Sequence, residues 1–517
     1  MLTPTIEASY KRRWLVLAVL CLSIFLLVVC NMALNVALPT LGRELHAGVS
    51  SLAWIVDLYV LCFAGLLLPA GAMGDRFGRK GLLQFGLLVF MVASALGAFS
   101  TTAWELMLAR AVMGVGAALV MPGTLSILAT VFPPSERPKA IAVWASVAGG
   151  SVAISITLSG AMLEHFWWGS IFLGMAFVAA FALVAGWLVL PTSRHPEEAR
   201  LDPVGAVLSV IAVSGLLYGF IQAPDDGWLS APILLSFVIG LVGLAGFIYW
   251  ERRSDNPMLD LSFFSERRFS AGSLSIAMAY FALFGMYFLF TQYFQLVRGY
   301  SPLVAGLYAL PAGLAQLLVA NLSRPFVARH GFRPVLVCGL VSSACGLFIL
   351  TSSGVTSPTW VFEVGLALVG MGIGLTMPPA SGAIMSSLPP HKAGVGSAVN
   401  DLVRELGGAF GIGVLGSVTL SHYRSGIGAV IAAQPARAVQ AKAGLSEALG
   451  VGGGPDSAIG LAARHAYSGG LDLAMVVGAI LVLAAAVAAY LVLPATRKSA
   501  PQPTTSKHQT ATLDLAR

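Results

Sequence analysis

The sequence predicts an all-α integral membrane protein built as a single bundle of fourteen spanning helices. Of its 517 residues, 57% are hydrophobic and only 10% are charged, whereas a water-soluble domain carries about 25% charged residues. So few charges cannot cover a soluble surface of this size, and the excess apolar surface has to face lipid. The length therefore indicates one membrane bundle rather than several soluble domains.

Fourteen apolar runs follow one another along the chain, and each can cross a hydrocarbon core of about 30 Å as a helix. They are 14–38, 51–73, 81–100, 104–131, 140–163, 168–191, 204–222, 232–250, 270–296, 303–327, 334–353, 359–387, 395–421 and 470–493. The first run comes after a short basic stretch, but it is too long for the apolar region of a secretory signal peptide. We expect it to be the first spanning helix.

Lysine and arginine are distributed unequally between alternate loops. If the N-terminus is cytoplasmic, 22 of the 30 lysines and arginines fall in inner segments, six fall in outer segments, and Arg110 and Arg404 fall inside helices. Such an excess on the cytoplasmic side is the rule for membrane proteins, and an odd number of helices would scramble it. The asymmetry predicts a multi-pass protein of the plasma (inner) membrane with both termini cytoplasmic. Topology thus accounts for the net charge of +7, and no nucleic-acid partner is expected.

The runs form three blocks, which predict two pseudo-symmetric six-helix bundles plus two additional helices. We expect a cytoplasmic N-terminus, an N-terminal bundle, two inserted helices, a C-terminal bundle with an extracellular loop, and a disordered cytoplasmic tail. Their bounds are 1–13, 14–191, 204–250, 269–493 with its loop at 422–469, and 498–517. A short surface helix is expected within that loop, at Ala438–Leu449. A faint repeat supports a duplication, because Arg76-Phe-Gly78 and Arg329-His-Gly331 occupy corresponding loops of the two halves.

The segment Gly71-Ala-Met-Gly74-Asp75-Arg76-Phe-Gly78-Arg79-Lys80 is similar to the loop 2–3 signature of the major facilitator superfamily, Gly-x-x-x-Asp-Arg-x-Gly-Arg-Arg/Lys. Other segments agree, namely Asn35-Val-Ala-Leu-Pro39, Trp54-Ile-Val-Asp57-Leu-Tyr59, the helix with Arg110 and Gly114, Gln295-x-x-x-Gly299 and Ser397-Ala-x-Asn400. Over roughly 14–493 the chain resembles the fourteen-helix drug:proton antiporters of that superfamily, which include multidrug and quaternary ammonium exporters.

This resemblance implies the major facilitator fold and proton-coupled efflux of lipophilic or cationic drugs by alternating access. The implied partners are a small-molecule substrate, protons and membrane lipid. It also implies that the loop residues latch the two halves together on the cytoplasmic side. These gating residues are Gly71, Gly74, Asp75, Arg76, Gly78, Arg79 and Lys80. The alternative for the same loop is a cluster of charges that only sets topology.

Other functions remain open or are disfavoured. Cys30 stands where cation exporters of this family often carry an acid, and the Gly-Pro typical of their helix 5 is absent around Ser155–Gly160. A facilitator or uptake transporter of a small metabolite is therefore an alternative, as is a non-transporting membrane sensor. The sequence contains no His-Glu-x-x-His, Gly-x-Ser-x-Gly or P-loop motif. We expect neither an enzyme nor an ATP-driven pump, and no cofactor or metal.

Ionisable residues inside the membrane are functional candidates because a charge at the bilayer centre costs about 2.5–3.5 kcal/mol even on the lenient scale. Asp57 and Arg110 each lie about two turns into their helices from the outer side. We hypothesise that they form a pair near Asn31 that couples transport to protons; a permanent ion pair is the alternative. Arg404 and Glu405 are candidates for the same role in the C-terminal half, or else they reach the interface as neighbours that need not pair.

Uncharged polar side chains and one aromatic residue are the candidates for substrate binding. They are Asn31, Cys30, Asn35, Tyr59, Gln292, Gln295, Gln316 and Asn321. Each could instead form a hydrogen bond between helices. Small residues spaced by four, such as Gly407 and Gly411, predict close helix approach.

Overall fold

The computed structural model describes residues 12–47, 49–192, 201–352, 354, 357–428, 430 and 435–493. Its long helices are α2 (Arg13–Glu44), α3 (Val49–Phe77), α4 (Arg79–Ala98), α5 (Ala103–Val131), α6 (Arg137–His165), α7 (Gly169–Val189), α8 (Pro203–Asp226), α9 (Ala231–Glu251), α10 (Arg267–Gln292), α11 (Pro302–His330), α12 (Phe332–Ile349), α13 (Thr359–Ser386), α14 (Ala393–Gly426) and α18 (Ala458–Val492). The predicted tail, and the predicted N-terminal segment before Arg12, lie outside the described residues.

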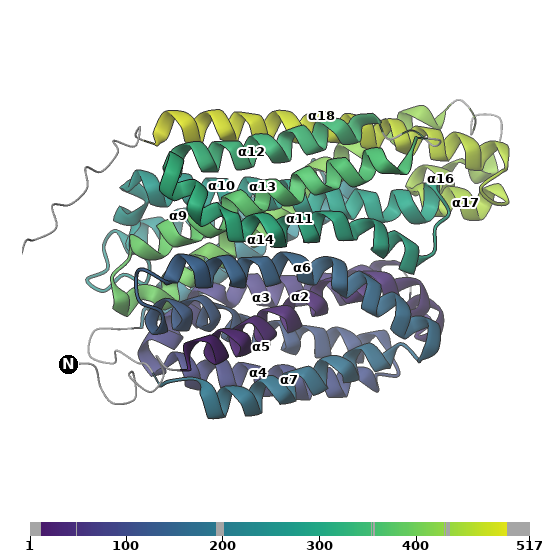
Figure 1. Ribbon diagram of the computed structural model, residues 1–517. Helices are drawn as coiled ribbons and strands as arrows, with labels where there is room; N and C mark the ends of the chain where they lie inside the picture. Colours follow the sequence, from purple (N-terminus) through teal and green to yellow (C-terminus); the bar gives the residue numbers. More distant parts are fainter. Residues whose placement is uncertain are drawn as a thin grey trace, which may run out of the picture.

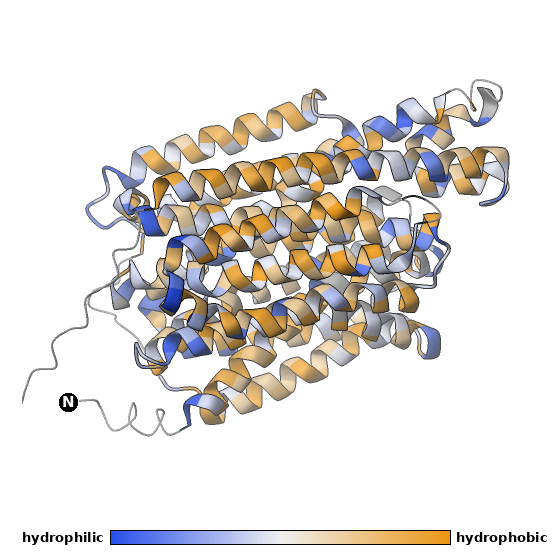
Figure 2. Ribbon diagram, turned by 45° about the horizontal axis from the view of Figure 1, so that its top comes forward, coloured by the Kyte–Doolittle hydropathy of each residue, from blue (hydrophilic) through white to orange (hydrophobic). Residues whose placement is uncertain are grey.

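The predicted all-α membrane architecture is confirmed. Among the described residues, 13 helices are long and apolar enough to cross a membrane, and α6 makes a fourteenth if its two segments, bent by 41°, form one span. Figure 2 shows apolar residues along the sides of the bundle and hydrophilic residues at its two ends. Helix α9, for example, leaves Leu235, Val238 and Val242 more than half exposed, as a lipid-facing helix should.

The helices gather into two groups. In Figure 1, α2 to α7 lie together in the lower part of the bundle, and α10 to α14 with α18 lie in the upper part. One seam between the groups joins α6 to α11, and the other joins α3 and α5 to α14. We call the two ends of the bundle the Arg13 end and the Glu44 end, after the first and last residues of α2.

Helices α8 and α9 form a hairpin that packs on the second seam, because α8 contacts both α3 and α14. At its Arg13 end the Asp202 carboxylate caps α8 by accepting from the Gly205 N–H at 2.9 Å. It also accepts from Trp250 Nε1 of α9 at 2.9 Å. At the other end the chain turns at Gly227, whose φ of +88° favours glycine. The hairpin is therefore fixed at both ends.

The region predicted as loop 422–469 is largely helical. Helix α14 runs on to Gly426, and α18 already begins at Ala458. Two short helices, α16 (Pro435–Ala443) and α17 (Leu445–Gly452), replace the single predicted surface helix. The prediction relied on apolar character, and it missed the first turns of α18 because Arg464 and His465 interrupt that character.

Helices α10 and α14 approach each other closely, as the glycine spacing predicted. A Cβ atom on Gly411 would collide with the backbone carbonyl oxygen of Phe281 in α10, whereas one on Gly416 would meet Phe288 at an ordinary 3.4 Å. We therefore expect Gly411→Ala to lower the free energy of unfolding by about 1–3 kcal/mol through overpacking. Gly416→Ala should be neutral or slightly stabilising because alanine favours helix. Equilibrium unfolding in detergent measures both, and equal effects would contradict the close approach.

Candidate functional site

A cavity lies between the two groups of helices, and its empty space of about 480 Å³ includes a part that is open to solvent. One wall comes from α2, α3, α5 and α6, and the other comes from α10 and α14. Its lining residues are Leu27, Val28, Asn31, Tyr59, Phe63, Met121, Ala148, Gly149, Val152, Tyr280, Leu283, Phe284, Arg404 and Glu405. The walls are mostly apolar and aromatic, and Arg404 and Glu405 provide their charges.

Three charged residues of α14 form a buried cluster at this wall. Arg404 Nη2 lies 3.1 Å from Glu405 Oε1, and Arg404 Nη1 lies 3.6 Å from Asp401 Oδ1. The guanidinium also lies against the Tyr280 ring, 5.6 Å from its centroid. Two carboxyl groups thus share one guanidinium. Arg404 and Glu405 do pair, because their long side chains bridge the angle between neighbouring helix positions.

Asp401 is a candidate that the sequence analysis missed. It is fully buried, and its Oδ2 has no hydrogen-bond partner. Its other oxygen is 3.4 Å from Asn400 Nδ2, and Asn400 Oδ1 accepts from Ser381 of α13 at 2.7 Å. The residue lies inside the apolar run 395–421, so the cost of an intramembrane charge, which singled out Arg404 and Glu405, would have found it as well.

Arg110 enters the first wall from α5 and is completely buried. Its Nη1 donates to Cys30 Sγ at 2.9 Å, and its Nε donates to the Ile55 carbonyl at 3.0 Å. The guanidinium lies over the Tyr59 ring at 4.2 Å, an arrangement that stabilises a desolvated cation. Its Nη2 has no hydrogen-bond partner. A buried positive charge therefore lies directly behind an aromatic residue of the cavity wall.

The predicted ion pair between Asp57 and Arg110 is not formed. Asp57 Oδ2 instead accepts from Gln222 Nε2 of α8 at 2.8 Å. Successive helix residues are about 100° apart, so Asp57 and Tyr59 point in nearly opposite directions. Because Tyr59 faces the cavity and Arg110, Asp57 faces α8. Gln222 was also missed, since a lone glutamine in a helix outside the two bundles gives no strong signal.

The other predicted substrate-binding residues divide into three groups. Asn31 and Tyr59 line the cavity, and Cys30 lies behind it as a partner of Arg110. Four residues do not line the cavity formed by the described residues, and they are Gln292, Gln295, Gln316 and Asn321. The side chain of Asn35 lies outside the described part of the structure.

The structure places these four residues elsewhere. Gln316 lies in the α6–α11 seam and donates to the Ala145 carbonyl at 3.2 Å. Asn321 is exposed and bonds within its own helix, to the Leu317 carbonyl at 2.8 Å. Gln292 and Gln295 lie toward the Glu44 end, at the end of α10 and in the π-helical turn that follows it.

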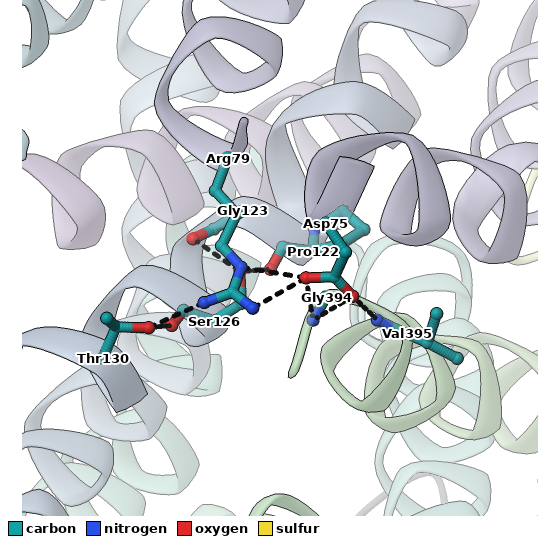
Figure 3. Close-up of polar contacts among 8 residues, drawn as sticks. All are labelled: Asp75, Arg79, Pro122, Gly123, Ser126, Thr130, Gly394 and Val395. Carbon is teal, nitrogen blue, oxygen red and sulfur yellow. Dashed lines mark hydrogen bonds and ion pairs between the residues drawn. The ribbon is translucent and has the colours of Figure 1, made fainter. Parts of the chain in front are cut away.

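At the Arg13 end, Asp75 of α3 joins the two groups of helices (Figure 3). Its carboxylate accepts from the backbone N–H of Gly394 at 2.9 Å and of Val395 at 3.2 Å, at the start of α14. An acid at a helix N-terminus satisfies otherwise unpaired N–H groups and the helix dipole. Arg79 binds the same carboxylate at 2.7 Å and Thr130 Oγ1 at 2.7 Å. We call Asp75, Arg79, Gly394 and Val395 the latch.

Glycines let the latch close. A Cβ atom on Gly71 would lie 2.6 Å from the Gly394 carbonyl oxygen, and one on Gly394 would lie 2.5 Å from that of Gly71. Gly78 makes the turn into α4 with a φ of +111°. The predicted gating residues Gly71, Asp75, Gly78 and Arg79 are thus brought together, and Gly74 lies within the same turn, near Arg79.

Two further predicted gating residues lie at the edge of the latch. Lys80 donates to the Trp187 carbonyl of α7 at 2.8 Å, so it bonds within the first group of helices. The Arg76 guanidinium lies 6.0 Å from the centroid of the Phe77 ring.

Comparison with known proteins places the chain among membrane transporters. A family model described as Major Facilitator Superfamily matches residues 20–412. The chain is 34% identical to the multidrug efflux pump LfrA of Mycolicibacterium smegmatis, over 94% of this chain and 97% of that protein. It is 31% identical to the methyl viologen resistance protein SmvA of Salmonella typhimurium, over 88% and 93% of the two chains.

Solved structures agree on the fold. The human organic anion transporter MFSD10 matches with a TM-score of 0.58 at 14% identity, over 93% of this chain and 100% of that chain. A bacterial homologue of the lysosomal transporter Spinster matches with a TM-score of 0.56 at 16% identity, over 95% and 98%. These matches and the two helix groups closing around a central cavity lead to one conclusion: this chain belongs to the Major Facilitator Superfamily.

Proposed function

We propose that this chain exports lipophilic or cationic drugs across the plasma membrane by alternating access, in exchange for protons. The observation that carries the proposal is the apolar and aromatic cavity between the two helix groups, with the Glu405 carboxylate on its wall. Relatives between 31% and 34% identical are named for multidrug efflux and methyl viologen resistance. In this proposal the Arg13 end and both termini are cytoplasmic.

The charged residues of the cavity supply the coupling. An ionised Glu405 attracts a cationic drug, and Tyr59 and Phe284 offer aromatic faces to it. A proton that binds the Asp401–Arg404–Glu405 cluster removes that attraction, so drug and proton exclude each other. Asp57, near the Glu44 end, is the second proton-accepting group. Arg110 contributes a fixed positive charge behind Tyr59.

The latch sets the direction of access. With Asp75 bound to the start of α14, the cavity is closed at the Arg13 end, so a drug in the cytoplasm reaches the cavity only after these bonds break. The Gly71–Gly394 contact also keeps this end closed, because it leaves no room for side chains between α3 and α14. Alternating access then consists of opening the latch while the Glu44 end closes.

Efflux of preloaded ethidium tests the proposal in a bacterium that lacks its main drug pumps. We expect efflux above the vector control that stops when a protonophore is added. Glu405→Gln should slow efflux about tenfold to a hundredfold, the range of about 1.5–3 kcal/mol for interactions of a charged group. Glu363→Gln, the same change on an exposed residue of α13, should have no effect. Efflux that persists in protonophore would instead indicate a facilitator.

A further inference from the structure

Helix α8, which belongs to neither six-helix group, joins the two groups near the Glu44 end. On one side Gln222 donates to Asp57 of α3 at 2.8 Å. On the other side Trp228, just beyond α8, donates to Ser417 Oγ of α14 at 2.7 Å. The rings of Phe220 and Phe410 meet edge to face at 5.2 Å between their centroids. The same helix therefore contacts the proposed proton-accepting Asp57 and the helix that carries the Asp401–Arg404–Glu405 cluster.

The packing between α8 and α14 is tight as well as polar. A Cβ atom on Gly413 would lie only 2.5 Å from the carbonyl oxygen of Phe220. The Phe220 ring also packs against Phe237 of α9 at 5.2 Å, which backs α8 from the other side. A displacement of α8 at Gln222 is thus transmitted to α14, because close-packed helices cannot absorb it locally.

The chemistry of a glutamine amide suits a partner that gains and loses a proton. An ionised carboxylate only accepts hydrogen bonds, and the Gln222 N–H group supplies one. A protonated carboxyl group must donate its O–H, and the amide oxygen can accept it after the amide turns over. One side chain can therefore serve both protonation states of Asp57, although in different orientations. Asp57 is only 7% exposed, so water competes little with this hydrogen bond.

Ionisable groups on the helices packed against α3 have partners or positions of their own. Arg110 of α5 bonds Cys30 of α2. Tyr218 of α8 packs its ring on Trp54 of α3 at 5.9 Å, and Asp226 ends α8. Arg404 and Glu405 of α14 line the cavity with Tyr59.

We propose that Gln222 is a positioning residue for proton exchange. It controls the protonation of Asp57, and through α8 it transmits a change in that protonation to α14. The proposal rests on the proposed function of Asp57 as a proton-accepting group. It gives the inserted hairpin a role in coupling, beyond filling the seam between the two helix groups.

The first test is the pH profile of ethidium efflux in Gln222→Met, which keeps the length of the side chain and removes its N–H donor. Without the donor the carboxylate of Asp57 is less favoured, so Asp57 keeps its proton to higher pH. We expect the profile to move about one pH unit toward alkaline pH, the scale of one hydrogen bond to a charged group. Gln222→Glu, which adds a second acid, should move it further in the same direction.

A matched control separates this effect from a loss of packing. Gln84 of α4 is a half-buried glutamine whose amide lies against Gly186 of α7, with no acid beside it. Gln84→Met removes a comparable amide, so it should change the amount of folded protein at most and leave the pH profile in place. If the Gln222→Met and Gln222→Glu profiles coincide with the unmodified protein, the proposal is wrong.

A second measurement does not depend on transport. In the purified full chain, the infrared band of protonated carboxyl groups that disappears in Asp57→Asn reports Asp57 directly. Its midpoint should rise by about one pH unit in Gln222→Met. If it rises while ethidium efflux is absent, Gln222 controls Asp57 and the proposed export fails. If efflux is proton-driven and lost in Asp57→Asn but the midpoint does not move, the role of Gln222 fails alone.

Discussion

Replacement of Asp75 by asparagine should open the cavity toward the Arg13 end and abolish efflux. Asparagine keeps the shape of the side chain but loses the charge that Arg79 and the start of α14 both bind. Arg79 is 2% exposed, and leaving one partner of a buried ion pair alone costs about 3–5 kcal/mol. If only about 2.7 kcal/mol of that cost falls on the closed state, the equilibrium shifts about a hundredfold toward the open latch. The reason is that about 1.4 kcal/mol changes an equilibrium constant tenfold.

Labelling of a cavity cysteine measures this opening. Val152 lines the cavity and is 3% exposed, so a Val152→Cys variant reports access to it. In inside-out vesicles an impermeant maleimide should label this cysteine much faster when Asp75→Asn is added. Glu136→Gln is the control, because it breaks an ion pair at the same end whose partners Arg13 and Glu136 are 20% and 31% exposed. Equal labelling in both variants would show that the latch does not close the cavity.

Arg404→Ala should be the most destabilising substitution in the cavity wall. The guanidinium is the shared partner of Asp401 and Glu405, and its removal leaves two buried carboxyl groups without a counter-charge. We expect the free energy of unfolding to fall by about 3–5 kcal/mol. Ethidium efflux should fall at least a hundredfold. Equilibrium unfolding in detergent and efflux from cells measure the two effects.

Two comparisons make this expectation specific. Arg13→Ala removes a cation from a partly exposed pair and should cost only about 0–1 kcal/mol. Arg404→Lys keeps the charge but replaces a planar group that contacts two carboxyls by a point charge, so it should recover stability in part. A loss in Arg404→Ala no larger than in Arg13→Ala would contradict the shared ion pair.

The cavity wall shows where sequence reasoning succeeds and where it stops. The cost of a charge in the membrane selected Arg110, Arg404 and Glu405 as functional candidates, and all three are buried. The same reasoning did not predict their partners, because the depth of a residue in its helix does not give the direction of its side chain. Asp57 and Arg110 lie at similar depth, yet Asp57 bonds α8 and Arg110 bonds α2.

The polar uncharged candidates lie in different surroundings. Asn31 and Tyr59 line the cavity, but Gln316 lies in a seam between helices and Asn321 is exposed. Glutamine and asparagine satisfy their hydrogen bonds equally well in a cavity, in a seam or along their own helix. Their presence in an apolar run therefore does not predict which neighbour the side chain faces, and this depends on how the helices pack.

The sequence by itself predicted the membrane class, a number of spans that agrees with the 13 or 14 found among the described residues, and the latch segment. The first two follow from local properties, since apolar length and charge asymmetry can be counted along the chain, and the latch segment was identified by its resemblance to a superfamily signature. The tertiary structure alone decided that Asp75 meets the start of α14, that Asp401 shares Arg404 with Glu405, and that Gln222 of α8 holds Asp57. The contacts of Asp75 and Gln222 join helices far apart in the sequence and depend on helix rotation and close packing. The Asp401–Arg404–Glu405 contacts lie within α14, and they depend on side-chain conformations that its buried surroundings select.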